Sequence, residues 1–169
     1  MYVAIRFSWL MALAVLTCAT AQNAYGQLVP YKAQGKNAVF FPATGAFSGV
    51  GVATHFGRSV HSGALVTVST GPLTANFEST SPLVVTAASG DTLLLRMQGQ
   101  VEFVPLDSSL TVFTAVWSAQ ANVVGGTGRF ANVKPGPQPL SVVATNEPFR
   151  LTDPQWKFSW QFSGNFRLR

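Results

Sequence analysis

The chain has a single cysteine, Cys18, and only 10% of its residues are charged. Because Cys18 lies in an N-terminal segment that we expect to be removed, the mature chain has no thiol that could form a disulfide, attack a substrate or bind a metal. The stability of the fold must therefore come from the packing of its side chains.

Helical periodicity is also missing. Beyond residue 21, apolar side chains nowhere recur at positions i, i+3, i+4 and i+7 over a helix length. Several stretches instead alternate apolar and polar residues, which is the period of a half-buried strand. The sequence therefore predicts an all-β fold.

The chain has no cluster of basic residues. Its 11 Lys and Arg against 6 Asp and Glu give a net charge of +5, and the loss of Arg6 with the N-terminal segment would leave +4. A nucleic-acid-binding surface concentrates such charges and places stacking aromatic residues among them, whereas here they are scattered. We expect no nucleic-acid partner.

Motifs of common enzyme classes are missing as well. The chain has no Gly-x-Ser-x-Gly elbow, and residues 125–130 have neither the spacing nor the following helix of a phosphate-binding loop. His55 and His61 have no acidic or cysteine ligand close by in the sequence, so we predict no metal site and no cofactor. We assign no catalytic residue and favour a non-enzymatic role.

The first 21 residues have the pattern of a secretory signal peptide. A short basic region ends at Arg6, an apolar run covers residues 7–16, and small residues at positions 19–21 form a cleavage pattern. The run is too short for a membrane-spanning helix. We predict cleavage after Ala21, with Gly26 as the second choice, and a secreted or periplasmic location.

The rest of the chain is predicted to be one domain. Residues 22–46 form a lead-in with a first short strand near 38–41, and residues 47–169 form a β-barrel. Alternation predicts the remaining strands at residues 47–55, 58–70, 75–78, 83–87, 93–103, 113–123, 140–145 and 156–168.

The stretch 156–168 carries the clearest alternation, with Trp156, Trp160 and Phe166 on its apolar face. At about 3.3 Å per residue it would run roughly 40 Å, and only a strongly coiled or closed sheet keeps one face covered over that length. We predict that it closes an antiparallel barrel of about eight strands, connected as a meander. Strands 93–103 and 113–123 are expected to pair.

Glycines and one carboxylate mark expected turns. Gly49 and Gly51 fall on one face of their strand, which indicates a close backbone approach. Residues 125–130 are interpreted as a glycine-rich turn after which Arg129 and Phe130 begin a strand. Asp91 follows a turn glycine and is expected to accept hydrogen bonds from the backbone amides of the turn.

Three segments carry a resemblance to a known family: Gly51-Val52-Ala53-Thr54-His55-Phe56-Gly57-Arg58, Thr86-Ala87-Ala88-Ser89-Gly90-Asp91-Thr92-Leu93 and Gly125-Gly126-Thr127-Gly128-Arg129-Phe130. In this order they resemble bacterial secreted proteins built on the allene oxide cyclase-like barrel, which plant dirigent proteins share. The resemblance covers roughly residues 47–168. It implies an eight-stranded barrel with an apolar interior and, from the plant members, a homotrimer. No catalytic residue of the plant cyclases is carried over to a matching position.

The candidate ligand-binding residues form two groups. His55 and Arg58 could together bind an anion or polarise a carbonyl; alternatively, His55 bonds a neighbouring backbone and Arg58 pairs with a carboxylate such as Glu102. The second group could line a ligand cavity or fill the barrel, since eight strands allow both. It consists of Trp117, Phe158, Trp160 and Phe162.

Three functions stay open at this point. The first is binding of a small apolar molecule, or a structural role, by an exported barrel. The second is a cyclase or isomerase that steers an apolar intermediate by shape, which would call for a polar side chain inside the apolar cavity. The third is an outer-membrane barrel with its apolar face toward lipid.

Overall fold

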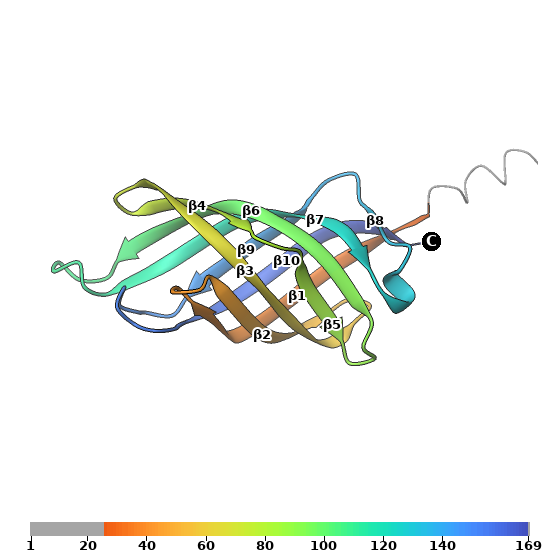
Figure 1. The fold of residues 1–169 in the computed structure, drawn as a ribbon, viewed down its shortest axis with the longest axis horizontal. Helices are drawn as coiled ribbons and strands as arrows, with labels where there is room; N and C mark the ends of the chain where they lie inside the picture. Colours follow the sequence, from red (N-terminus) through yellow and green to blue (C-terminus); the bar gives the residue numbers. More distant parts are fainter. Residues whose placement is uncertain (1–25, 169) are drawn as a thin grey trace, which may run out of the picture.

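The computed structural model describes residues 26–168, and within them the chain is all-β (Figure 1). One short 3-10 helix, η2 (Gly128–Phe130), interrupts the strands. The strands are β1 (Gln27–Phe41), β2 (Ala46–Ala53), β3 (Gly57–Gly71), β4 (Thr74–Ser79), β5 (Leu83–Ala87), β6 (Thr92–Pro105), β7 (Phe113–Gly126), β8 (Lys134–Pro135), β9 (Leu140–Asn146) and β10 (Trp156–Leu168).

These strands form one antiparallel sheet that closes in a ring. Each long strand pairs with a neighbour in the chain, and β10 returns to pair with β1 from Gln27↔Leu168 to Phe40↔Trp156. The prediction that residues 156–168 close the sheet is therefore confirmed, as is the pairing of β6 with β7. β4 and β5 together occupy one place in the ring, because both pair with β3 and with β6.

The apolar faces of the strands turn inward and form the core. Trp156, Trp160 and Phe166 of β10 are all buried, as their alternation predicts. At the end of the ring near the C-terminus, the rings of Phe56 and Phe130 stack with their centroids 4.2 Å apart. Tyr31 lies beside them and is completely buried. This end of the interior is filled by side chains.

The first strand is much longer than predicted, because β1 covers 15 residues and belongs to the closed sheet over its whole length. Pro30 hides it in the sequence, since proline cannot donate to a ladder. In the structure, Pro30 O accepts from Thr54 Oγ1 and lies 3.1 Å from His55 Nε2. This side of Pro30 faces the β2–β3 turn, so the missing N–H breaks no strand pairing.

Two turn predictions were wrong. Residues 128–130 form η2 and do not begin a strand, and Phe130 turns into the core. Asp91 accepts from the hydroxyl of Ser89 at 2.8 Å and pairs with Arg129 at 3.2 Å. The carboxylate of Asp91 therefore connects the β5–β6 turn to η2. The prediction had been that it accepts hydrogen bonds from backbone amides of the turn.

The predicted signal peptide and its cleavage after Ala21 lie outside the described residues. Among residues 26–168, no helix has the length and apolar character needed to cross a membrane.

Candidate functional site

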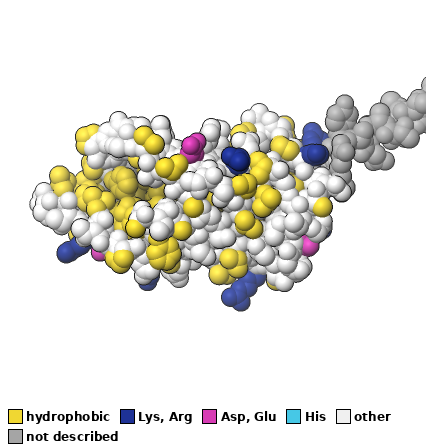
Figure 2. All heavy atoms as spheres, in the orientation of Figure 1, with side chains coloured by type: hydrophobic (Ala, Val, Ile, Leu, Met, Phe, Trp, Pro, Cys, Tyr) yellow, Lys and Arg dark blue, Asp and Glu magenta, His cyan; other side chains and the backbone are white. Residues whose placement is uncertain are grey.

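The ring is open on one side of β3. β2 pairs with β3 only as far as Ala64, whereas β3 continues to Gly71 with β4 as its partner. Thr67 and Ser69, which continue the inward-facing positions of β3, are exposed for this reason. Figure 2 shows hydrophobic side chains gathered in a hollow beneath the β3–β4 hairpin, toward the left of the view.

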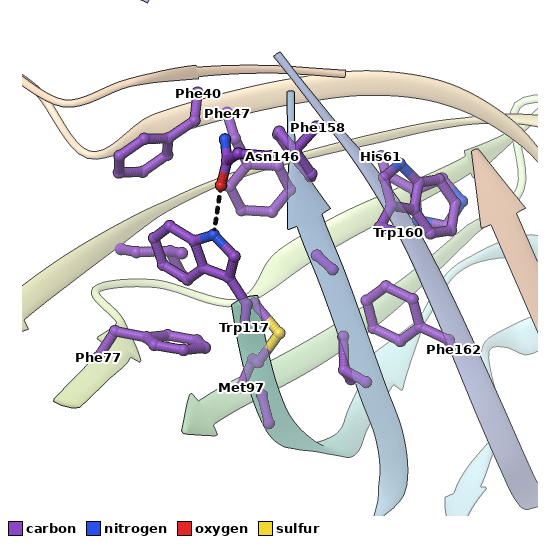
Figure 3. Close-up of a pocket in the computed structure, with 14 residues that line it drawn as sticks. Phe40, Phe47, His61, Phe77, Met97, Trp117, Asn146, Phe158, Trp160 and Phe162 are labelled. Atoms are coloured by element: carbon purple, nitrogen blue, oxygen red, sulfur yellow. Dashed lines mark hydrogen bonds between the residues drawn. The ribbon is translucent and has the colours of Figure 1, made fainter. Parts of the chain in front are cut away.

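This opening leads to an apolar cavity. The space open to the centre of a water molecule is about 60 Å³, several times the roughly 10–15 Å³ that one water needs. Figure 3 shows aromatic rings from several strands around it. The lining residues are Phe40, Phe47, His61, Leu65, Phe77, Met97, Trp117, Ala119, Val142, Ala144, Asn146, Phe158, Trp160 and Phe162.

Three glycines make room for the largest ring in the wall, the indole of Trp160. A β-carbon built on Gly35 would lie 2.7 Å from Cζ2 of Trp160, and one on Gly51 would lie 2.8 Å from the same atom. A β-carbon on Gly49 would lie 3.2 Å from its Nε1. The close approach predicted for β2 is confirmed, and a side chain of β10 makes part of it.

The first polar feature of the wall is a buried hydrogen bond between Trp117 and Asn146. The indole Nε1 of Trp117, on β7, donates to Oδ1 of Asn146, on β9, at 2.6 Å (Figure 3). Asn146 Nδ2 donates in turn to the backbone oxygen of Lys157 at 3.1 Å. Both polar ends of the amide are therefore used in holding β7, β9 and β10 together.

The second polar feature is His61, on β3. Its Nε2 lies 3.0 Å from the hydroxyl of Ser59, and both residues are buried. The imidazole also lies against Trp160, with ring centroids 4.1 Å apart. Burial lowers the pKa of His61 to about 4, because a charged imidazolium is poorly solvated there. His61 is therefore neutral at neutral pH.

The structure brings four of the six predicted ligand-binding residues together. Trp117, Phe158, Trp160 and Phe162 all line the cavity. His55 lies in the exposed turn after β2, with Nε2 3.1 Å from Pro30 O, so the alternative in which it contacts a neighbouring backbone is confirmed.

Arg58 is also exposed on the outside of the sheet. The suggested pairing of Arg58 with Glu102 was wrong, since the ion pair found among residues 26–168 joins Arg129 to Asp91. Glu102 lies opposite Thr74 on β4, whereas Arg58 lies opposite Val52 on β2.

Sequence reasoning missed both polar residues of the cavity. His61 was weighed only as a metal ligand, and the described residues contain no group of three or more His, Cys, Asp or Glu that could hold a metal ion. Asn146 lay just beyond the strand predicted at residues 140–145 and was given no role, whereas in the structure it is the last residue of β9. The alternation of β3 could have indicated the position of His61, because odd-numbered residues such as Ser59, His61 and Leu65 share the inward face of the strand.

No protein-family model, no curated protein and no solved structure matches the chain. The chemistry of the cavity is therefore the basis for any functional conclusion.

Proposed function

We propose that this protein binds a small, uncharged, largely apolar molecule inside its closed sheet. The observation that carries the proposal is the apolar cavity under the β3–β4 hairpin, in an interior whose opposite end is filled by side chains. Protein interiors hold few voids larger than a water molecule, and apolar clefts with a few polar groups are the usual form of small-molecule sites. On this proposal the chain is an exported β-barrel with the allene oxide cyclase-like fold.

The lining supports an uncharged ligand. Of the 14 lining residues, His61 and Asn146 are the ones with a polar side chain other than an indole, and none carries a formal charge at neutral pH. Burying an ionised ligand there would leave its charge without a partner, which is costly. Rings such as Phe77 and Phe162 instead offer flat apolar surface.

A cyclase or isomerase is the second candidate, and the presence of His61 in the cavity favours keeping it. Such an enzyme would steer an apolar intermediate by shape and use the imidazole to position or deprotonate it. A general base works best when its pKa is close to the working pH, whereas burial lowers the pKa of His61 to about 4. Binding without reaction is therefore the better supported function.

The outer face of β6 argues for a water-exposed exterior and against an outer-membrane barrel. On β6 the outward positions include Arg96, Gln98, Gln100 and Glu102, all of which are exposed. A membrane barrel carries apolar residues outside and polar residues inside, which is the reverse arrangement. Recovery of the protein in a detergent-extracted membrane fraction would overturn this view.

Native mass spectrometry of the purified mature protein tests the proposal. We expect a retained small molecule on the wild type and on Val143→Leu, whose side chain lies on the outer face of β9. The neighbouring Ala144→Leu adds atoms to the cavity wall and should lose that mass. Equal retention by both variants would place the ligand elsewhere. The same spectra report whether the trimer implied by the family resemblance forms.

A further inference from the structure

The inference concerns the chemical class of the ligand, and it rests on the proposed function. We propose that His61 is the specificity-determining residue of the cavity: its Nδ1–H donates a hydrogen bond to a carbonyl or ether oxygen of an uncharged ligand. Ser59 fixes the tautomer that makes this donor available.

The tautomer follows from the hydrogen bonds of the pair. Ser59 is 2% exposed, and its hydroxyl contacts Nε2 of His61 at 3.0 Å. If Nε2 carried the proton, the hydroxyl hydrogen of Ser59 would have no acceptor among residues 26–168. In the other tautomer the unpaired donor is Nδ1–H of His61, a residue that lines the cavity, so this donor can meet water or a ligand there, whereas the hydroxyl of the almost completely buried Ser59 cannot. Ser59 therefore donates to Nε2, and the proton of the neutral imidazole sits on Nδ1.

The donor at Nδ1 is free. Within the described residues Nδ1 of His61 has no hydrogen-bond partner, and His61 is part of the cavity wall. The other polar groups of the wall are already engaged or turned aside. Asn146 bonds Trp117 and the backbone of Lys157, and Nε1 of Trp160 lies toward Gly49.

The aromatic rings around His61 further restrict which ligands can bind. The ring centroid of His61 lies 4.1 Å from that of Trp160 and 6.0 Å from that of Phe162. A planar ligand group that reaches Nδ1 would therefore lie among aromatic faces. A carboxylate in the same place would bring a full charge into an apolar space that holds no cation, so anions should be rejected.

Three molecules of similar size separate the effect of the hydrogen bond from the effect of charge. Ethylbenzene has no polar atom, acetophenone adds a carbonyl oxygen, and benzoate adds a charge. Binding to the wild type at pH 7.5 is measured by titration calorimetry or by NMR shifts. We expect acetophenone to bind about tenfold more tightly than ethylbenzene, as one good hydrogen bond allows. Benzoate should bind at least about 100-fold more weakly than acetophenone.

The matched variant is Ser59→Ala/His61→Phe, which keeps a ring beside Trp160 and removes both halves of the polar pair together, so that no buried group is left unpaired. In this variant acetophenone and ethylbenzene should bind within about threefold of each other, while ethylbenzene binds as it does to the wild type. A preference for acetophenone that survives in the variant would overturn the assignment, as would tight binding of benzoate to the wild type.

A measurement on the wild type keeps the inference testable if the variant does not fold. Long-range proton–nitrogen NMR spectra of the imidazole report which nitrogen carries the proton. We expect the Nδ1–H form and a change in its shift on adding acetophenone that ethylbenzene does not produce. The Nε2–H form would refute the inference. If neither molecule binds the wild type, the proposed function fails together with the inference; if both bind equally, only the inference fails.

Discussion

The indole of Trp160 lies where a side chain at Gly51 would begin, since a β-carbon on Gly51 would be 2.8 Å from its Cζ2. The two residues come from strands far apart in the chain, and β1 lies between those strands in the ring. Gly35 of β1 and Gly49 and Gly51 of β2 form a glycine strip against which the indole of β10 packs. This strip sets the position of one cavity wall.

Adding a methyl group to this strip should destabilise the fold. We expect Gly49→Ala and Gly51→Ala to lower the free energy of unfolding by about 1–3 kcal/mol each, because the new atom overlaps its neighbours in a tightly packed wall. Gly125→Ala is the control, since its nearest neighbour would be Cδ1 of Leu94 at 3.8 Å. Urea midpoints of the Gly49 and Gly51 variants that equal the control would show that the strip has room to spare.

The hydrogen bond between Trp117 and Asn146 should contribute to stability. Trp117→Phe leaves Oδ1 of Asn146 without its donor in a buried position, which should cost about 1–3 kcal/mol. A double-mutant cycle with Asn146→Leu isolates the pair, and we expect a coupling of about 0.5–3 kcal/mol from urea unfolding. Strictly additive effects would mean that the bond contributes nothing of its own.

The buried hydroxyl of Tyr31 contrasts with the hydrogen-bonded pair of Trp117 and Asn146. Its side chain is completely buried, and its hydroxyl has no hydrogen-bond partner in the described part of the chain. Burial also raises the pKa of this phenol above its ordinary value, so it is neutral. Because an unpaired buried hydroxyl is costly, Tyr31→Phe should leave the melting temperature unchanged or raise it. A clear drop would reveal a partner for the hydroxyl.

The buried imidazole of His61 should make stability depend on pH. Its pKa is 6.5 in the unfolded chain and about 4 in the fold, so between these values the unfolded chain binds a proton that the folded chain does not. Stability is therefore lost as the pH falls from about 6.5 to about 4, by roughly 3 kcal/mol in all. Urea unfolding at pH 7.5, 6 and 5 should show this slope in the wild type and a shallower one in His61→Gln. Identical slopes would contradict the assignment.

Strand alternation predicted the ring because it reports which side chains share a face. The apolar residues of β10, β6 and β7 turn inward as their period of two requires. The same signal misleads on β3, where Val60, Val66 and Val68 alternate but lie on the outer face. Branched residues favour strands on either face, and the inner face of β3 carries Ser59 and His61 instead.

The cavity could be predicted only in part. Trp117, Phe158, Trp160 and Phe162 are large aromatic residues on apolar faces, so their meeting inside the ring follows from alternation and closure. The polar groups depend on contacts between strands. Asn146 matters because β9 places it beside Trp117, and His61 becomes part of the cavity wall because the closed sheet brings β10 across the interior and sets Trp160 against its ring. Contacts between strands that lie far apart in the chain cannot be predicted from the residue pattern of a single strand.

The most direct test of the central claim is an NMR measurement of where acetophenone sits in the mature protein. Intermolecular nuclear Overhauser effects from its methyl and ring protons should reach Trp117, Ala144 and Trp160, which line the cavity. They should be missing for Val143, which neighbours Ala144 and faces outward. Contacts confined to outer residues such as Val143, or a titration that does not saturate, would contradict a binding site inside the closed sheet.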